Sequence, residues 1–164
     1  MTDAVTPADI DPIDRLAILA AALPGAVVRQ RQITAPFDAV WRVVADLEHA
    51  IPRYEPGVAH VRVVERHGEL LRVLVQDTGG REEMMDAKLR PGWCLMQSAT
   101  VVVAFAARAL GDQTLLAHLE HRRAATARSA RSARSARSYD PRPAEAKVDQ
   151  ELQVIERLAT QPGE

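Results

Sequence analysis

Two histidines near the end of an apolar run, His118 and His121, are the side chains best suited to acid–base or metal chemistry. If residues 113–123 form a strand, their side chains alternate between two faces, so a spacing of three places the two imidazoles on opposite faces. They cannot then bind the same metal ion. His118 and Glu120 share a face, but two ligands without a third are a weak basis for a metal site. We therefore predict neither a metal site nor a cofactor.

The same strand supplies the first candidates for ligand contact. Leu115, Ala117 and Leu119 share a face with His121, and we expect this apolar face to point inward, toward a cavity. His121 would then lie at the rim, where a neutral imidazole can hydrogen-bond a ligand oxygen. The alternative is a strand-end histidine that faces water.

Three further side chains are candidates for a ligand pocket. Tyr54 lies between Pro52 and Pro56 and is either a lid residue with a polar tip or an exposed loop tyrosine. Met85 lies on an apolar face of its predicted strand. Trp93 is either a pocket wall or a core plug, because the sequence does not decide which face of its strand points inward.

The sequence carries no motif of a known catalytic class. It lacks a Gly-x-Ser-x-Gly elbow, a phosphate loop and a dinucleotide fingerprint. Its one cysteine, Cys94, excludes an internal disulfide framework and a multi-cysteine zinc site, and it favours a cytoplasmic location. We interpret Cys94 as a buried small hydrophobe with a raised pKa.

Charge is distributed unevenly along the 164 residues, which is the length of one domain. Residues 122–142 hold seven arginines and one acid, a local net charge of +6, and the remainder has a net charge of −7. An acidic body is a poor nucleic-acid surface, so we do not expect nucleic acid as a partner. Within the basic segment, Ala-Arg-Ser is repeated over residues 127–138. It is either a solvated insertion or a weak contact for anionic surfaces through Arg128, Arg131, Arg134 and Arg137.

Hydrophobic periodicity divides the chain into an N-terminal arm with one short helix, residues 1–26, and a single domain, residues 27–160. The predicted strands span residues 27–34, 58–66, 69–78, 81–90, 93–98, 100–110 and 113–123. Short connections make them antiparallel. Helices are predicted at residues 37–46 and 144–160, the second with an apolar stripe of Val148, Leu152, Ile155 and Ala159. The longest uncharged run, residues 91–107, is assigned to two strands, so we predict no membrane span.

Several segments resemble a known superfamily. Residues 33–46, Ile-Thr-Ala-Pro-Phe-Asp-Ala-Val-Trp-Arg-Val-Val-Ala-Asp, followed by Pro52, resemble the opening of the START-like (SRPBCC, polyketide cyclase/dehydrase and lipid transport) superfamily. Residues 91–97 and 111–120 look like its later strands. The resemblance implies an α+β helix-grip fold, in which a seven-stranded curved antiparallel sheet wraps around a long C-terminal helix and encloses a hydrophobic cavity.

Three functions follow as hypotheses. The leading one is binding of a small hydrophobic ligand, whether polyketide, aromatic or lipid-like, in the cavity between the sheet and the C-terminal helix. The alternative is an aromatase/cyclase-type enzyme, for which His121 and Tyr54 are the candidate acid–base groups. The third is a regulatory or membrane-surface module that acts through the arginine repeat.

Overall fold

A computed structural model describes residues 10–123 and 141–161. The Ala-Arg-Ser repeat and its four arginines lie outside these residues. The described chain forms one seven-stranded antiparallel sheet in the order β1-β7-β6-β5-β4-β3-β2. Its strands are β1 (Val27–Ile33), β2 (Val58–His67), β3 (Leu70–Asp77), β4 (Glu82–Arg90), β5 (Trp93–Gln97), β6 (Val101–Leu110) and β7 (Gln113–Arg122). The predicted helix-grip architecture is confirmed.

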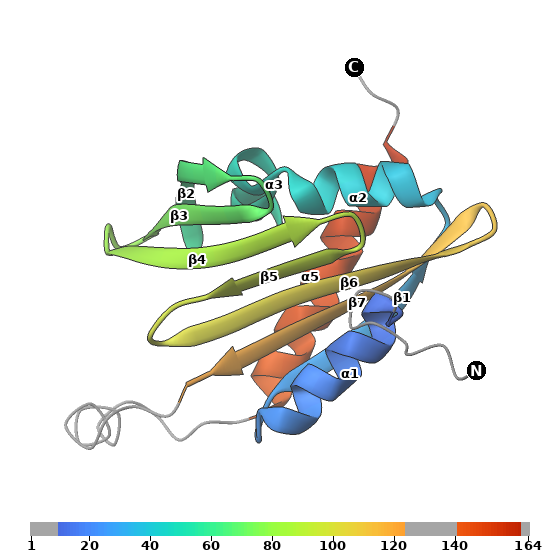
Figure 1. The fold of residues 1–164 in the computed structure, drawn as a ribbon, viewed down its shortest axis with the longest axis horizontal. Helices are drawn as coiled ribbons and strands as arrows, with labels where there is room; N and C mark the ends of the chain where they lie inside the picture. The colour runs from blue at the N-terminus through green and yellow to red at the C-terminus, as the bar shows by residue number, and fades with distance from the viewer. Residues whose placement is uncertain (1–9, 124–140, 162–164) are drawn as a thin grey trace, which may run out of the picture.

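Helices cover both faces of the sheet (Figure 1). They are α1 (Pro12–Ala22), α2 (Phe37–Ala45), α3 (Leu47–Tyr54) and α5 (Pro141–Thr160). The long helix α5 crosses one face, which we call the inner face, and it contacts β1, β7, α2 and α3. Helix α1 lies on the opposite, outer face against β6 and β7.

The apolar stripe predicted for the C-terminal helix holds α5 on the sheet. Val148, Leu152 and Ile155 are buried, because positions i, i+4 and i+7 share one side of a helix. Two ion pairs add to this contact: Arg29 of β1 lies 2.6 Å from Glu145, and Arg31 lies 3.0 Å from Glu156. Exposed pairs of this kind stabilise by only about 0.2–1 kcal/mol each, so apolar burial dominates the docking of α5.

Helix α3 is an element that periodicity did not predict. The sequence predicts a short turn over residues 48–51 before Pro52 and a loop at Pro56-Gly57, and Pro52 does remove one helical hydrogen bond. The helix nevertheless continues through Pro52 to Tyr54, since Leu47, Ile51 and Tyr54 are all buried on one side of it. Tertiary packing outweighs the local cost of the proline.

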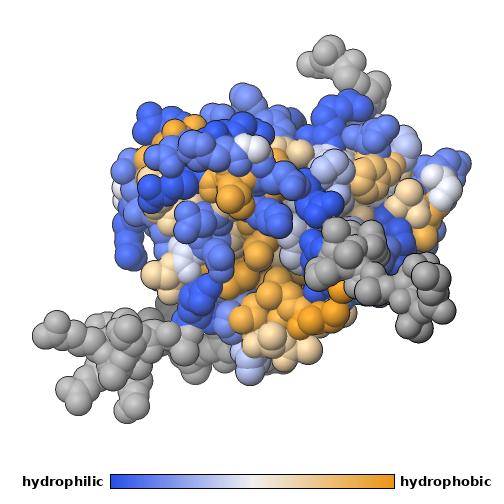
Figure 2. Space-filling view, viewed as in Figure 1, coloured by the Kyte–Doolittle hydropathy of each residue, from blue (hydrophilic) through white to orange (hydrophobic). Residues whose placement is uncertain are grey.

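Helix α1 closes a second apolar core on the outer face. Asp11 caps it by accepting a hydrogen bond from the Ile13 amide at 2.9 Å. Ile13 and Leu16 pack against Trp93 and Leu119. Figure 2 shows apolar residues gathered over α1, while most of the same face is hydrophilic. Within the described residues, no helix has the length and hydropathy of a membrane span.

Candidate functional site

A cavity of about 60 Å³ lies on the inner face of the sheet, beside α3 and α5. Its apolar walls are formed by Ile51, Tyr54, Met85, Met96 and Val103. Its polar groups are Glu55, His118, Glu120 and Glu151. Cross-strand register explains the grouping: Met96 pairs with Val103, and Val103 pairs with Glu120, so these side chains form a row on one face.

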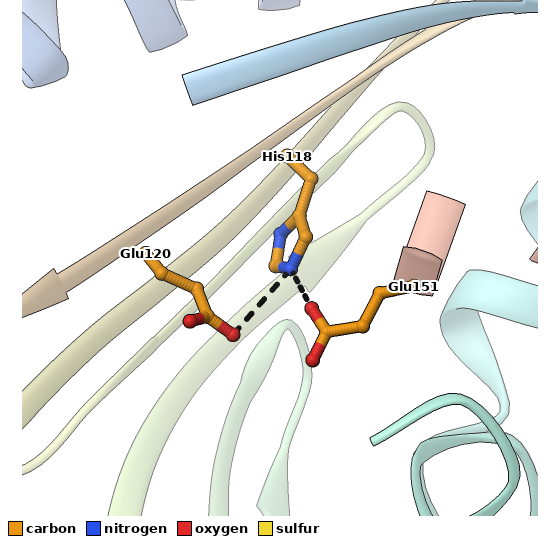
Figure 3. Close-up of side chains that lie close together, drawn as sticks. All are labelled: His118, Glu120 and Glu151. Atoms are coloured by element: carbon orange, nitrogen blue, oxygen red, sulfur yellow. Dashed lines mark hydrogen bonds and ion pairs between the residues drawn. The ribbon is translucent and has the colours of Figure 1, made fainter. Parts of the chain in front are cut away.

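His118 of β7 is the centre of the polar group. Its Nδ1 lies 3.1 Å from the Ala104 carbonyl oxygen, and its Nε2 lies 2.6 Å from Glu151 Oε2 on α5. Figure 3 shows His118 and Glu120 projecting from β7 toward Glu151 on the facing helix. Phe105 stacks flat on the imidazole, with ring centroids 3.9 Å apart. The ring is thus fixed at both nitrogens and across one face.

The two hydrogen bonds and the pKa shifts together assign the protonation of this pair. A carbonyl oxygen only accepts, so Nδ1 carries a hydrogen, and the proton between Nε2 and Oε2 resides on the group with the higher pKa. Burial lowers the pKa of His118 to about 4, because the imidazolium is disfavoured away from water. Burial also raises the pKa of Glu151 to about 10, and neighbouring Glu55 and Glu120 act in the same direction. At neutral pH a neutral acid therefore donates to a neutral imidazole.

Lys147 of α5 links the three carboxyl groups. Its Nζ lies 2.5 Å from Glu55 Oε2, 2.6 Å from Glu120 Oε1 and 3.0 Å from Glu151 Oε1. Burial lowers the pKa of Lys147, but the carboxylates outweigh it, so the net shift is upward and the lysine stays charged. Burial likewise raises the pKa of Glu55, yet its contacts with Glu151 and Lys147 bring it below its usual value. Glu151 Oε1 has no hydrogen-bond partner in the described residues, so the Lys147 ammonium meets it only as a charge beside the carbonyl-type oxygen of a neutral acid.

Tyr54 supplies an aromatic wall of the cavity. Its ring packs edge-on against Phe105, with centroids 5.8 Å apart. Burial raises its pKa well above the usual value, and the nearby Cys94 thiol and the carboxyl groups add to the shift. Tyr54 therefore presents a neutral phenol to the cavity.

The structure brings together two of the five predicted ligand-contact residues, Tyr54 and Met85, both of which line the cavity. Tyr54 is buried at the end of α3, which corrects its predicted position in a loop. Trp93 and Leu119 are buried on the outer face beneath α1. His121 lines a separate hollow of about 190 Å³ beside the turn before β1.

The expected inward face of β7 is wrong. His118 and Glu120 point into the cavity, and the apolar face with Leu119 points toward α1. We assumed that the more apolar face must be the one facing the helix-covered interior. Because α1 covers the outer face of this strand, both faces of β7 are buried. The apolar face packs in the outer core beneath α1, and the polar face lines the inner cavity.

Three site residues were not found from the sequence: Glu55, Lys147 and Glu151. Glu151 did carry a recognisable signal. It lies three residues after Val148 and four before Ile155, within the apolar stripe of the helix. A charged residue in such a stripe indicates a buried polar group with a partner. Nothing local in the sequence points to Glu55, which follows α3 and reaches Lys147 only through the tertiary fold.

A scan against protein-family models finds no match, and a search of curated proteins finds no relative. Solved structures, however, match most of the chain. The Zhui aromatase/cyclase from Streptomyces sp. R1128 is 19% identical with a TM-score of 0.54, and the match covers 82% of this chain and 92% of that one. The di-domain ARO/CYC BexL from the BE-7585A biosynthetic pathway is 16% identical with a TM-score of 0.57, covering 83% and 48%. A START superfamily protein from Mycobacterium smegmatis is 16% identical with a TM-score of 0.50, covering 81% and 92%.

The chain has the START-like fold. The resemblance found in residues 33–46, 91–97 and 111–120 is thus confirmed at the level of architecture. Since the identities are below 20%, the likeness extends to the fold alone. The chemistry of this chain must therefore be argued from its own side chains.

Proposed function

We propose that this START-like chain binds a small, mainly apolar ligand in the cavity on the inner face of the sheet. The observation that carries the proposal is the arrangement of that cavity, with five apolar or aromatic wall residues and a cluster of polar groups at one side. Ligand sites commonly combine apolar walls with a few placed polar groups. The aromatase/cyclase and START superfamily structures of the same fold support a ligand-binding or cyclase role.

Cavity size limits what part of a ligand can enter. A volume of about 60 Å³ accommodates a few water molecules or the end of a molecule, whereas pockets for whole ligands measure roughly 300–1,000 Å³. A larger polar hollow of about 400 Å³ lies further along the same strands. Glu83 and Arg122 in that hollow are each two residues beyond a cavity residue, Met85 and Glu120, and so share the inner face. We propose that the ligand is elongated, with its apolar end inside and its polar end in the outer hollow.

The polar side of the cavity would orient the inserted end. Tyr54 is a donor, and the Glu120 carboxylate is an acceptor. The neutral Glu151–His118 pair can exchange its internal hydrogen bond for one to a ligand oxygen. Burial of apolar ligand surface would supply most of the affinity, at about 25 cal/mol per Å².

Thermal-shift screening against apolar and aromatic compounds tests ligand binding. We expect some compounds to raise the melting temperature of the wild-type chain. Val103→Phe fills the cavity and should abolish the shift, while Val64→Phe changes a 38% exposed residue and should preserve it. Equal shifts in both variants, or no shift with any compound, would contradict the proposal. Native mass spectrometry would show directly whether a ligand copurifies.

A second candidate function is cyclase-type catalysis, and it is favoured by one observation: a proton-carrying pair, Glu151 and His118, lines the cavity. Glu151 can donate its proton to a ketone oxygen, and His118 can accept one, which is the acid–base work such a reaction needs. Of the two residues first considered for this role, Tyr54 lines the cavity and His121 does not.

Turnover of a poly-β-ketone tests the catalytic candidate. Glu151→Gln retains the shape and a donor group but cannot release a proton, so the rate should fall by about 10²–10⁴-fold. Glu156→Gln, on the same helix but paired with Arg31, should leave the rate unchanged. Turnover that survives Glu151→Gln would exclude this function.

A further inference from the structure

We propose that His118, Glu120 and Glu151 form a binding site for a first-row divalent metal ion such as zinc. One ligand atom from each of the three residues lies within 4.8 Å of the other two. Figure 3 shows the three side chains converging from β7 and α5 on one point. The sequence showed only two ligands on one strand face, and the fold adds the third from a helix that is distant along the chain. This inference goes beyond apolar ligand binding and does not depend on it.

The histidine is held as a metal ligand is held. Its Nδ1–H donates to the Ala104 carbonyl oxygen, which leaves the Nε2 lone pair facing the two carboxyl groups. Phe105 stacks on the ring at 3.9 Å and restricts its rotation. Ligating histidines in proteins are commonly fixed in this way through their second nitrogen.

The distances are close to those of a coordination sphere. His118 Nε2 lies 2.6 Å from Glu151 Oε2 and 3.8 Å from Glu120 Oε1. Around tetrahedral zinc, with metal–ligand bonds of about 2.0–2.2 Å, neighbouring ligand atoms lie about 3.4 Å apart. Metal binding would therefore lengthen the first distance and shorten the second, each by less than about 1 Å. Side-chain torsion alone can supply such shifts.

Charge balance favours a dication. Three carboxyl groups, Glu55, Glu120 and Glu151, face a single cation, Lys147. With Glu151 protonated, the cluster has a net charge of −1. A divalent ion would take the place of the proton that lies between Glu151 Oε2 and His118 Nε2, and this proton is released to solvent. The three carboxylates with Lys147 then have a net charge of −2, which the ion neutralises within a largely buried site. Lys147 is also the competitor, because its ammonium contacts Glu120 Oε1 and Glu151 Oε1.

The donor set selects the class of metal. One imidazole nitrogen with two carboxylates suits zinc, manganese or iron better than calcium or magnesium, which prefer oxygen alone. Three protein ligands leave at least one coordination position open, and the adjoining cavity can supply a water molecule to it. Sites with an open position are typical of reactive metal centres, whereas structural zinc sites are closed.

Zinc titration of the full 164-residue chain, after treatment with a chelator and without organic ligand, tests this site. We expect one zinc ion per chain, a raised melting temperature, and visible absorption when Co²⁺ replaces zinc. Glu151→Gln and His118→Gln should each weaken zinc binding by at least about 100-fold, since even outer-shell changes cost 10–100-fold. The matched controls Glu156→Gln and His121→Gln, on the same two elements, should bind as the wild type does.

Lys147→Met separates this proposal from a structural role for the cluster. Removal of the competing ammonium should tighten zinc binding by about tenfold or more, whereas a nonspecific surface site would not respond. Circular dichroism of each variant confirms that it is folded. Absence of stoichiometric zinc binding in the wild type, or equal binding in the Glu151→Gln and Glu156→Gln variants, would overturn the metal site. If an alkylammonium ion raises the melting temperature as much as zinc does, the cluster is an organic-cation site and not a metal site.

Discussion

Glu151 is a carboxyl group at a position on α5 where its neighbours are apolar. It is 1% exposed and lies between Val148 and Ile155, both fully buried. A buried ionised carboxyl group costs several kcal/mol, so the group is tolerated here only because it is neutral and hydrogen-bonded to His118. An apolar residue would fill the same place without that cost. Polar groups buried among apolar neighbours occur most often at functional sites, so Glu151 is the residue most indicative of function.

Backbone conformation at Gly92 gives a prediction at the residue scale. Its φ of +79° is strained for any residue with a Cβ, and a Cβ here would lie 3.1 Å from the Ala107 carbonyl oxygen. We expect Gly92→Ala to lower the free energy of unfolding by about 1–2 kcal/mol for the φ angle, with a further loss for the close contact. Urea unfolding of the variant measures the sum.

Gly111→Ala is the matched control for Gly92→Ala. Gly111 has a φ of +63° and nothing within 4 Å of the added Cβ, so it carries the conformational cost alone. Both substitutions restrict the unfolded chain equally, and that effect cancels in the comparison. If Gly111→Ala is as destabilising as Gly92→Ala, the close approach of β6 to Gly92 is not tight in solution.

Cys94 gives a second residue-scale prediction. The thiol is 2% exposed, and burial raises its pKa to about 12. Because the thiolate is the reactive form, we expect a disulfide reagent at pH 8 to label the folded chain at least about 100-fold more slowly than the chain in denaturant. Absorbance of the released thiol measures both rates. Fast labelling under native conditions would show that the inner face opens to solvent at this strand.

At the scale of elements, strands and the long helix could be predicted from the sequence because each has one strong period. The apolar stripe of Val148, Leu152 and Ile155 matches the buried side of α5. Alternation failed on β7, where His118 is 1% and Leu119 0% exposed, because the rule assumes that one face of a strand meets water. The sequence therefore identified strand β7 of the candidate site but not which of its side chains point inward. The carboxyl groups that meet His118 and Glu120 from the end of α3 and from α5 depend on tertiary structure.

Helix α1 is the element whose contribution to stability is most directly testable. Leu16 is 1% exposed between α1 and the outer face of the sheet, and Ile18, on the same helix, is 61% exposed. We expect Leu16→Ala to lower the free energy of unfolding by about 2–5 kcal/mol, because it leaves a cavity in the outer core. Ile18→Ala should change it by less than about 0.5 kcal/mol.

Chemical denaturation of the two variants decides whether α1 is an integral part of the domain. Leu16 lies on the opposite side of the sheet from the candidate site. Leu16→Ala should therefore lower the free energy of unfolding without changing the affinity for zinc. Equal stability of Leu16→Ala and Ile18→Ala would mean that the helix is not docked in solution.

For the molecule as a whole, one sheet supports two cores of different character. The outer core beneath α1 is formed by apolar residues, while the inner core between the sheet and α5 contains the cavity and its ionisable cluster. Because the two cores lie on opposite faces of the sheet, the inner face can carry polar groups while the outer core contributes stability. Lipid transport, a cytoplasmic location and a role for the arginine repeat remain predictions.

Adjacent methionines on β4 test whether the cavity sets the size of the ligand. Met85 is 5% exposed and lines the cavity, whereas Met84 points to the outer face and is 39% exposed. Met85→Ala should lower the free energy of unfolding by about 2–5 kcal/mol, and Met84→Ala should have little effect. The Met85→Ala cavity is larger by the volume of the lost side chain, so this variant should bind bulkier apolar compounds that the wild type and Met84→Ala reject. Fluorescence titration with aromatic probes of increasing size measures this selectivity. If Met85→Ala accepts only the probes that the wild type accepts, ligands do not occupy the part of the cavity next to Met85.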